Sequence, residues 1–293
     1  MQLKIKTIIL QEMVSQSIKG ASHNKMIPIT SLMAIELKDQ TLTLITTDAN
    51  NTLKIIEKDI EGGDFYIVVQ AEIFSKLISK ITTETITLSL KENNLEVKGN
   101  GVYNIELPLD EEGKLIKFPE YNFNTKAKKQ KFDSSNIDIL LNANKAALAD
   151  TMELPFLTGY YIDKGVITTD SFKVCHSDVK IFDDKLLLTA EMVELLDLME
   201  GKKIDLQQDK NKLLFTTDNI VIYGVQLDGI EDYPIDSIKE YLKTAFDSNC
   251  KLSRSDLLNV LDRLNLFVTT YDRNAVYLTF TPKGVIFDSR KSN

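Results

Sequence analysis

Several residue types that mark common classes of protein are scarce or missing in this chain. Among its 293 residues there is no tryptophan, and there are only two cysteines and two histidines. Cys175 and Cys250 lie too far apart for the spacing of a metal site, and they make no disulfide framework. No apolar run approaches the ~18–20 residues of a membrane span, and no apolar targeting segment follows the N-terminus. The sequence therefore favours a cytoplasmic protein with no membrane contact.

Motifs of catalysis and nucleotide binding are also missing. The chain contains no Walker-type phosphate loop, no GxGxxG, no HExxH, no CxxC and no GxSxG. Cys175 and His176 are adjacent, but neighbouring strand residues point to opposite faces of a sheet. A buried cysteine beside an exposed histidine is therefore favoured over a nucleophile and its base. Acidic pairs at 111–112 and 183–184 fall at turns. Solvated loops are a better explanation of these pairs than a metal site or a two-carboxylate catalytic site. We expect no catalytic residue, no metal, no cofactor and no enzyme activity.

The charge of the chain is acidic overall but unevenly distributed. A formal net charge of −8 argues against a simple basic nucleic-acid binder. A local patch decides whether phosphate is attracted, and four lysines crowd one short polar stretch, at positions 126, 128, 129 and 131. This stretch is either a phosphate contact or a linker kept soluble by its charge.

One unit recurs five times along the chain: an amphipathic helix followed by short alternating strands with a polar turn. The helices are expected at residues 11–18, 71–81, 136–148, 190–199 and 254–264, and the turns at 38–40, 91–94, 163–165, 208–211 and 281–284. A further strand is expected at residues 3–9, where apolar and polar residues alternate.

The spacing of the apolar residues predicts how these units pack. Helices keep i, i+4 spacing, as in Ile73, Leu77 and Ile81, and strands such as 41–45 alternate with a period of two. A unit with one helix and a few strands cannot bury its apolar faces alone, so the copies must stack. We predict an α+β fold with helices on one face of antiparallel sheets.

Two polar segments with proline or glycine mark domain boundaries, one at 111–131 with Pro119 and one at 228–249 with Gly229 and Pro234. The predicted domains are residues 1–125, 126–232 and 233–293. The first two domains hold two helix–hairpin units each, and the third holds one.

Three groups of short motifs, taken in order, resemble one family. They are Ile27-Pro28-Ile29 with Leu42-Thr43-Leu44 and Thr47-Asp48, then Thr169-Asp170-Ser171-Phe172-Lys173-Val174, then Asp232-Tyr233-Pro234. Together with the five units they make residues 1–293 resemble the bacterial DNA polymerase III beta subunit, the sliding clamp. By this resemblance, the three segments are clamp domains I and II and the N-terminal half of domain III.

The resemblance implies a processivity factor of DNA replication. Such a protein forms a homodimeric ring around double-stranded DNA and tethers DNA polymerase and clamp-loader peptides. Its inner helices contact phosphates without reading bases. The DNA-contacting residues implied here are Lys19, Lys25, Lys76, Lys80 and Lys145, with 126–131 at the rim. The alternative is a clamp-like protein-binding module that does not close around DNA.

The resemblance also implies a partner-peptide pocket and a subunit interface. The pocket residues are Thr169, Ser171, Phe172, Lys173, Val174, Pro234 and Ile238. Alternatively, Phe172 and Val174 are inward strand residues. The interface residues are Tyr103, Leu266 and Phe267. Alternatively, Phe267 folds back onto its own half-domain.

The chain departs from the family at two places. Ser171-Phe172-Lys173 stands where the family has Gly-His-Arg, so the pocket keeps a cation, loses a glycine and gains an aromatic side chain. The sixth helix–hairpin unit is absent, which predicts a gap in the ring wall and an exposed sheet edge. The chain is either a truncated product or a naturally short clamp, of host or mobile-element origin.

Overall fold

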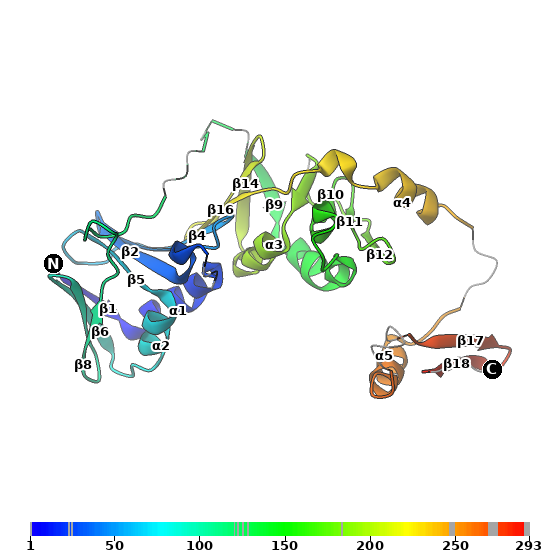
Figure 1. The fold of residues 1–293 in the computed structure, drawn as a ribbon, viewed down its shortest axis with the longest axis horizontal. Coiled ribbons are helices and arrows are strands. Elements are labelled where there is room, and N and C mark those ends of the chain that lie inside the picture. Colours follow the sequence, from blue (N-terminus) through cyan, green and yellow to red (C-terminus); the bar gives the residue numbers. More distant parts are fainter. Residues whose placement is uncertain are drawn as a thin grey trace. The chain divides into compact units, whose positions relative to one another are not determined.

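The computed structural model describes residues 2–22, 24, 26–119, 121, 123–124, 126–127, 129–182, 184–245, 250–268 and 275–289. The chain forms two compact units, Met1–Pro234 and Ile235–Asn293 (Figure 1). This division lies close to the boundary predicted at 232–233. The boundary predicted at 125–126 falls inside the first unit, and the division into three domains stays a prediction.

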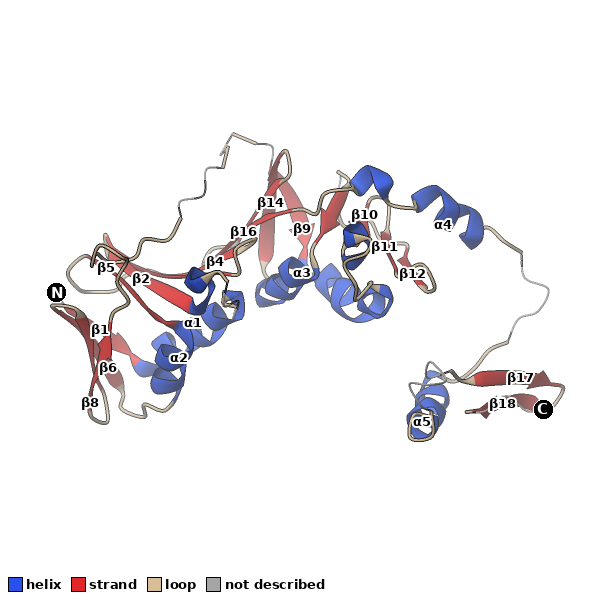
Figure 2. Ribbon diagram, viewed as in Figure 1, coloured by secondary structure: helices blue, strands red, loops and turns tan. Residues whose placement is uncertain are grey.

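One antiparallel sheet of eight strands runs through the first unit, in the order β5-β2-β3-β4-β16-β15-β14-β9 (Figure 2). Its strands are β2 (Leu32–Lys38), β3 (Thr41–Thr47), β4 (Thr52–Glu57), β5 (Phe65–Gln70), β9 (Lys129–Asp133), β14 (Lys203–Asp209), β15 (Lys212–Thr216) and β16 (Ile220–Val225). Strand β4 pairs with β16, and Leu53 lies opposite Ile222. This single pairing joins strands from the first and the second predicted domain.

Two smaller antiparallel sheets contain the other strands formed by the described residues of the first unit, in the orders β1-β6-β7-β8 and β12-β11-β10-β13. The former contains β1 (Gln2–Lys6), β6 (Thr85–Lys91), β7 (Asn94–Lys98) and β8 (Val102–Glu106). The latter contains β10 (Tyr160–Ile162), β11 (Val166–Thr169), β12 (Val174–Ser177) and β13 (Leu186–Leu188).

All five predicted turns join paired strands. The turn between β2 and β3, for example, holds Asp39 at φ 48° and Gln40 at φ 61°. Positive φ at both central residues gives the backbone twist that matches two flanking antiparallel strands. The turns between β6 and β7, β10 and β11, β14 and β15, and β17 (Tyr277–Thr281) and β18 (Gly284–Asp288) occupy the other four predicted positions. The prediction of an α+β fold with antiparallel sheets is confirmed.

The helices of the first unit are α1 (Thr7–Ser17), α2 (Ala71–Ser79) and α3 (Ala190–Leu196), with short 3₁₀ extensions η1 (Ile18–Gly20) and η7 (Asp197–Met199). The predicted strand at 3–9 is wrong beyond Lys6, because Thr7 already begins α1. The backbone N–H of Thr7 donates to the carbonyl of Glu84 at 2.9 Å, and its hydroxyl donates to the carbonyl of Thr83. These bonds end the strand and turn the chain into the helix.

The segment predicted as a helix at 136–148 is not a regular α-helix. It consists of a 3₁₀ turn η3 (Ser134–Asn136), a π-helix η4 (Ile139–Asn144) and a 3₁₀ turn η5 (Lys145–Ala147). The buried side-chain amide of Asn144 donates to the carbonyls of Val166 and Cys175, at 3.2 and 3.3 Å. These bonds tie the end of the π-helix to strands β11 and β12. Short π-helical turns are rare and are frequently found at functional sites.

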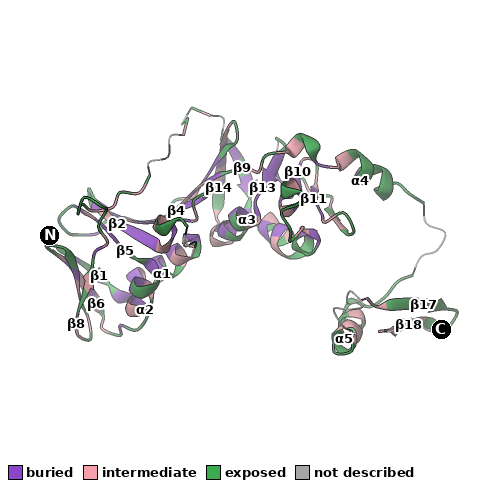
Figure 3. Cartoon of the chain, in the orientation of Figure 1, coloured by how far each residue is buried: buried purple, intermediate pink, exposed green. Residues whose placement is uncertain are grey.

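The core lies between the helices and the sheets (Figure 3). On β2, Met33, Ile35 and Leu37 face the main apolar cluster, which includes Leu10 of α1. Alternate residues face the other side of the sheet, where Leu32, Ala34, Ile45 and Val68 form a smaller cluster against Ile116 and Phe118. The eight-stranded sheet therefore has a face covered by helices and an outer face that a loop partly covers. On α2 the predicted apolar stripe is wrong at Ile73, which is 59% exposed, while Phe74 and Ile78 are buried.

The second unit contains α4 (Ile235–Leu242), α5 (Arg254–Leu264), β17 and β18. The bounds of α5 match the prediction, and the hydroxyl of Ser253 caps it by accepting from the N–H of Asp256 at 3.4 Å. Helix α4 lies within the segment 228–249, which the sequence marks as a domain boundary. No residue of α5 or β17 is buried. Within the described part of the chain, no helix has the length and apolar character that crossing a membrane requires.

Candidate functional site

Four of the five lysines predicted to contact DNA lie on the helical layer of the first unit, and three of these are paired with carboxylates. Lys19, on η1, lies 3.4 Å from Asp197 on η7. Lys145, on η5, lies 2.7 Å from Glu194 on α3, and Lys76 pairs with Glu72 one turn earlier on α2. Lys80 follows the end of α2 and is exposed. Lys25 lies outside the described residues.

Carboxylates outnumber lysines on these helical segments. Residues 7–20, 71–80, 134–147 and 190–199 carry four lysines and six carboxylates, the latter being Glu12, Glu72, Asp138, Glu191, Glu194 and Asp197. A cleft of about 610 Å³ between the two halves of this layer is lined by Lys19 together with Asp48, Glu191, Glu194 and Asp197. Exposed ion pairs contribute only about 0–1 kcal/mol each, but they lower the charge that each lysine presents to a phosphate. The helical face is therefore weakly charged, not strongly basic.

The lysine-rich stretch 126–131 is partly a strand. Lys129 and Lys131 belong to β9, where both are exposed, and Lys129 lies 3.7 Å from Asp205 on the neighbouring β14. Lys126 is exposed before the strand, and residue 128 lies outside the described part of the chain. The interpretation of the whole stretch as a linker is wrong from Lys129 onward, because its residues pair with β14.

The predicted pocket residues Thr169 to Val174 form the tight turn between β11 and β12. The Asp170 carboxylate accepts hydrogen bonds from the N–H groups of Phe172 and Lys173, at 2.9 and 2.7 Å. The Thr169 hydroxyl donates to the Lys173 carbonyl at 2.7 Å, and Ser171 has φ 75°. Burial raises the pKa of Asp170, but the two backbone hydrogen bonds and the nearby Lys173 ammonium outweigh it, so this pKa lies below its usual value.

The turn directs the side chains of Phe172 and Lys173 in different ways. Phe172 is 93% exposed, so the alternative that it is an inward strand residue is wrong. Val174 is half-buried at the start of β12. The Lys173 ammonium is held by the carbonyl of Ala146 and by Asp170, both at 3.1 Å. An exposed aromatic ring beside a fixed cation gives this turn the chemistry of a contact surface.

The same turn occurs a second time, between β3 and β4, which sequence reasoning missed. There the Asp48 carboxylate accepts from the N–H groups of Asn50 and Asn51, at 2.8 and 2.6 Å. The Thr47 hydroxyl donates to the carbonyl of Asn51 at 2.6 Å, and Ala49 has φ 85°. The repeated Thr-Asp dipeptide after a strand was the available signal. The predicted pocket turn between β11 and β12 therefore has a counterpart in the turn between β3 and β4.

The linker residues Tyr233 and Pro234 close the first unit. The ring of Tyr233 stacks on Tyr161 with centroids 4.9 Å apart, and its hydroxyl donates to the carbonyl of Ile167 at 3.2 Å. Burial raises the pKa of Tyr233. Pro234 is half-buried, and Ile238 is buried in α4 of the second unit. Their assembly with the turn into one pocket stays a prediction.

The predicted interface residues are solvent-exposed. Tyr103 lies on β8, the edge strand of its sheet among the described residues, and is 40% exposed. Leu266 and Phe267 follow α5 and are 79% and 69% exposed. The alternative that Phe267 folds back onto its own half-domain is therefore wrong.

The Cys175–His176 pair shows no nucleophile–base geometry. Both residues lie on β12, where Cys175 is half-buried and His176 is exposed on the other face. The prediction of opposite faces is confirmed, although Cys175 is less buried than expected. Among the described residues, no three His, Cys, Asp or Glu side chains form a group that could hold a metal ion.

Comparison with known proteins gives one consistent likeness. Residues 1–113 match the family model described as DNA polymerase III beta subunit, N-terminal domain. The chain is 22% identical to the beta sliding clamp of Bacillus subtilis, over 100% of this chain and 81% of that protein. The crystal structures of the Bacillus subtilis sliding clamp and of the Thermotoga maritima beta subunit superpose with TM-scores of 0.76 and 0.79, both at 18% identity. Both cover 98% of this chain, and 83% and 82% of theirs.

The fold is therefore that of the sliding clamps, and the chain resembles beta clamps at low identity along nearly its whole length. Sliding clamps are a non-enzymatic family, and the likeness supports the expectation that this chain is not an enzyme.

Proposed function

We propose that this chain is a DNA sliding clamp, a cytoplasmic processivity factor that encircles duplex DNA and tethers replication proteins. The observation that carries the proposal is the layered first unit, in which one continuous eight-stranded sheet is covered on one face by α1, α2 and α3. The likeness to solved clamps over 98% of the chain supports it. A layer of this kind can present its helices to DNA and its sheets to solvent.

The weakly charged helical face fits topological retention better than tight direct binding. Non-specific DNA binding draws nearly all its free energy from phosphate contacts and counterion release. Lys19, Lys76 and Lys145 share their charge with carboxylates, so each contributes less than an unpaired lysine. A closed ring does not need strong contacts, because it cannot leave DNA without opening or reaching an end. Lys25 and Lys80 remain in the proposed set.

The proposed partner site is the turn from Thr169 to Val174, with Pro234 and Ile238. Short peptides gain most of their affinity from one or two buried apolar anchors. The exposed ring of Phe172 and the half-buried Val174 supply apolar surface, and Lys173 supplies a cation held in place. The partners would be polymerase and clamp-loader peptides.

The proposed subunit contact joins β8 of one copy to the region after α5 of another. An edge strand such as β8 offers unpaired backbone groups for sheet extension. Tyr103, Leu266 and Phe267 are exposed and apolar, so pairing them removes apolar surface from water. The result would be a homodimer.

The deciding experiment compares retention on circular and linear DNA. The labelled protein is loaded onto nicked circular duplex DNA with a clamp loader, or is assembled in the presence of that DNA. The mixture is then passed over a sizing column at 150 mM salt, about the physiological ionic strength. A ring stays with the circle and is lost when one restriction cut linearises it. Loss from both forms alike contradicts the proposal.

A second function, a clamp-like protein-binding module that does not close around DNA, is favoured by one specific observation. The helical segments carry six carboxylates against four lysines. This alternative predicts peptide binding at the Phe172 turn with no retention on either form of DNA. Titrating a labelled polymerase-tail peptide against wild type and Val174→Asp tests the turn separately. Equal affinities would remove the peptide site from this segment.

A further inference from the structure

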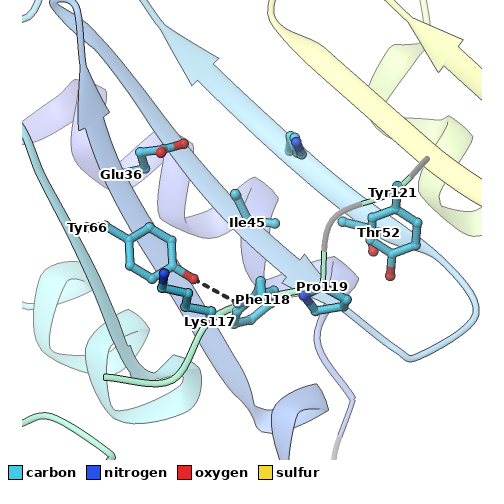
Figure 4. A pocket seen from close by; sticks show the side chains of 9 residues that line it. Glu36, Ile45, Thr52, Tyr66, Lys117, Phe118, Pro119 and Tyr121 are labelled. Carbon is cyan, nitrogen blue, oxygen red and sulfur yellow. Dashed lines mark hydrogen bonds between the residues drawn. The ribbon is translucent and has the colours of Figure 1, made fainter. Parts of the chain in front are cut away.

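A pocket of about 580 Å³ lies on the outer face of the eight-stranded sheet, opposite the helices (Figure 4). Ile45 and Thr52, from β3 and β4, form its floor, and Phe118, Pro119 and Tyr121 form a wall. The proposed partner turn at Thr169 to Val174 contributes no residue to it. This pocket is thus separate from the site already described.

The wall of the pocket is held in place by contacts at both ends. The backbone N–H of Phe118 donates to the Tyr66 hydroxyl at 2.9 Å, and Phe118 packs against the small apolar cluster that includes Ile45. The ring of Tyr121 stacks on Tyr223, with centroids 5.5 Å apart, and its hydroxyl lies 3.4 Å from that of Thr47. A preformed pocket loses little conformational freedom when a ligand binds.

The pocket occupies the place in the first half of the unit that the proposed peptide site has in the second half. Thr52 follows the Thr47–Asp48 turn as Val174 follows the equivalent Thr169–Asp170 turn. The aromatic–proline pair Phe118-Pro119 corresponds to Tyr233-Pro234, and each aromatic residue packs beside the preceding sheet. The chain therefore builds the same turn, strand and linker twice.

The charges around the pocket select the ligand. Among the described residues, Lys54 and Lys117 line it together with one carboxylate, Glu36. Neither lysine is in an ion pair within the described part of the chain, and the Lys54 ammonium lies 5.5 Å from the centre of the Tyr223 ring. Two cations beside aromatic walls favour a ligand that combines an apolar group with a negative charge.

A smaller hollow of about 290 Å³ adjoins the pocket across Tyr121 and is lined by Phe123, Leu213 and Val225. Both hollows share Tyr121. Two hollows separated by one ring, the first partly charged and the second more apolar, suit a chain that places successive side chains in each, better than a compact small molecule.

We infer that this outer pocket is a second peptide-docking site, which takes a short acidic segment with an apolar anchor from a partner protein. The inference rests on the proposed function in one respect, which is that the partner is a peptide segment of a protein tethered by the clamp. The site lets one subunit hold two partner segments, one at each of its two equivalent turns.

The absence of tryptophan from the chain permits a direct test in the full-length protein. The Phe118→Trp variant carries a single tryptophan in the pocket wall, and Phe172→Trp carries one at the proposed partner turn. Each variant is titrated with N-acetyl-Asp-Leu-Phe-amide and with N-acetyl-Lys-Leu-Phe-amide, and tryptophan emission is recorded. We expect saturable change in Phe118→Trp, with the acidic peptide bound about five-fold more tightly, the range of an exposed charge pair.

Charge reversal supplies the control. Adding Lys54→Glu to the Phe118→Trp variant should abolish or invert the preference between the two peptides. No emission change in Phe118→Trp, or the same preference after charge reversal, overturns the inference. A response in Phe172→Trp alone leaves the proposed partner turn standing and rejects the outer pocket, so the two failures are distinguishable. If Phe118→Trp melts well below wild type, Tyr121→Trp, at the other end of the same wall, replaces it as the reporter.

Discussion

At the scale of single residues, two aspartates hold the equivalent turns of the first unit. Asp48 and Asp170 each accept two backbone N–H groups that no strand partner satisfies. Short polar side chains do this well because they reach their own backbone two or three residues on. The residue after each aspartate, Ala49 or Ser171, has positive φ, a conformation that costs free energy in a non-glycine residue. The carboxylate bonds offset this cost.

Replacing Asp170 with alanine should therefore destabilise the protein by about 1–2 kcal/mol at pH 7, because two charge-assisted hydrogen bonds are lost. The pKa of Asp170 is lowered in the folded protein, so its contribution is complete above the unfolded value of about 3.9. That contribution is lost as pH falls through the lower folded pKa. Urea denaturation from pH 7 down to pH 3 measures it.

The matched control is Asp170→Asn, which keeps an oxygen acceptor but does not titrate. The free energy of unfolding of Asp170→Asn should be lower than that of wild type at pH 7, and the difference between the two proteins should shrink at acidic pH. A difference between the two proteins that stays constant over this range would contradict the assigned role of the carboxylate.

At the scale of elements, the contact between α3 and β16 closes the second half of the first unit. Gly224, on β16, faces Met192 of α3 and Asn51 of the Thr47 turn, and a Cβ built on it overlaps Met192 Cε and Asn51 Oδ1. Met192 and Asn51 are both buried, so neither can move into solvent. The close approach of helix, strand and turn thus depends on the missing side chain.

Gly224→Ala should destabilise the protein by about 1–3 kcal/mol, the usual cost of overpacking a well-packed site. Gly63→Ala is the matched control, because a Cβ there meets nothing within 4 Å. That substitution should be neutral or stabilising by up to about 1 kcal/mol, since alanine restricts the unfolded chain. Thermal melting of both variants measures the contrast. Equal changes in the two melting temperatures would show that the α3–β16 contact can relax.

At the scale of the whole molecule, the helical face shapes how the protein would hold DNA. The ion pair Lys19–Asp197 links a helical segment in the first half of the first unit to one in the second half. The ion pair Lys145–Glu194 links two helical segments within the second half. They join residues distant in sequence, such as Lys19 and Asp197, 178 positions apart. These pairs brace the layer and at the same time reduce its attraction for phosphate.

The double variant Glu194→Gln/Asp197→Asn frees Lys145 and Lys19. Under the proposed function, its affinity for a short linear duplex should rise, and the slope of log K against log salt should steepen by up to about two units, because each freed lysine can release a counterion. Fluorescence anisotropy across a salt series measures this. Glu12→Gln/Glu191→Gln removes the same charge without releasing a paired lysine, so an equal steepening in that control would contradict the role of the ion pairs.

Features that depend on neighbouring residues were determined by the sequence itself. The turn at Asp39–Gln40 and the bounds of α5 behind Ser253 follow from local backbone chemistry and one capping hydroxyl. On β2, alternate residues face opposite sides of the sheet, as a period of two predicts, but its first four residues are buried on both sides rather than on one. The candidate lysines came from the family resemblance, but the exposure of Lys76 on α2 is a local property of an amphipathic helix.

Features that join distant parts of the chain were decided only by the tertiary structure. The pairing of β4 with β16 selects one partner among many strands of similar composition. The carboxylates that neutralise Lys19 and Lys145 come from another helix, and the π-helix ends where Asn144 bonds to β11 and β12. Each of these outcomes depends on which surfaces meet. Local periodicity specifies that a face is apolar or polar, but the face it meets is selected by packing of the whole chain.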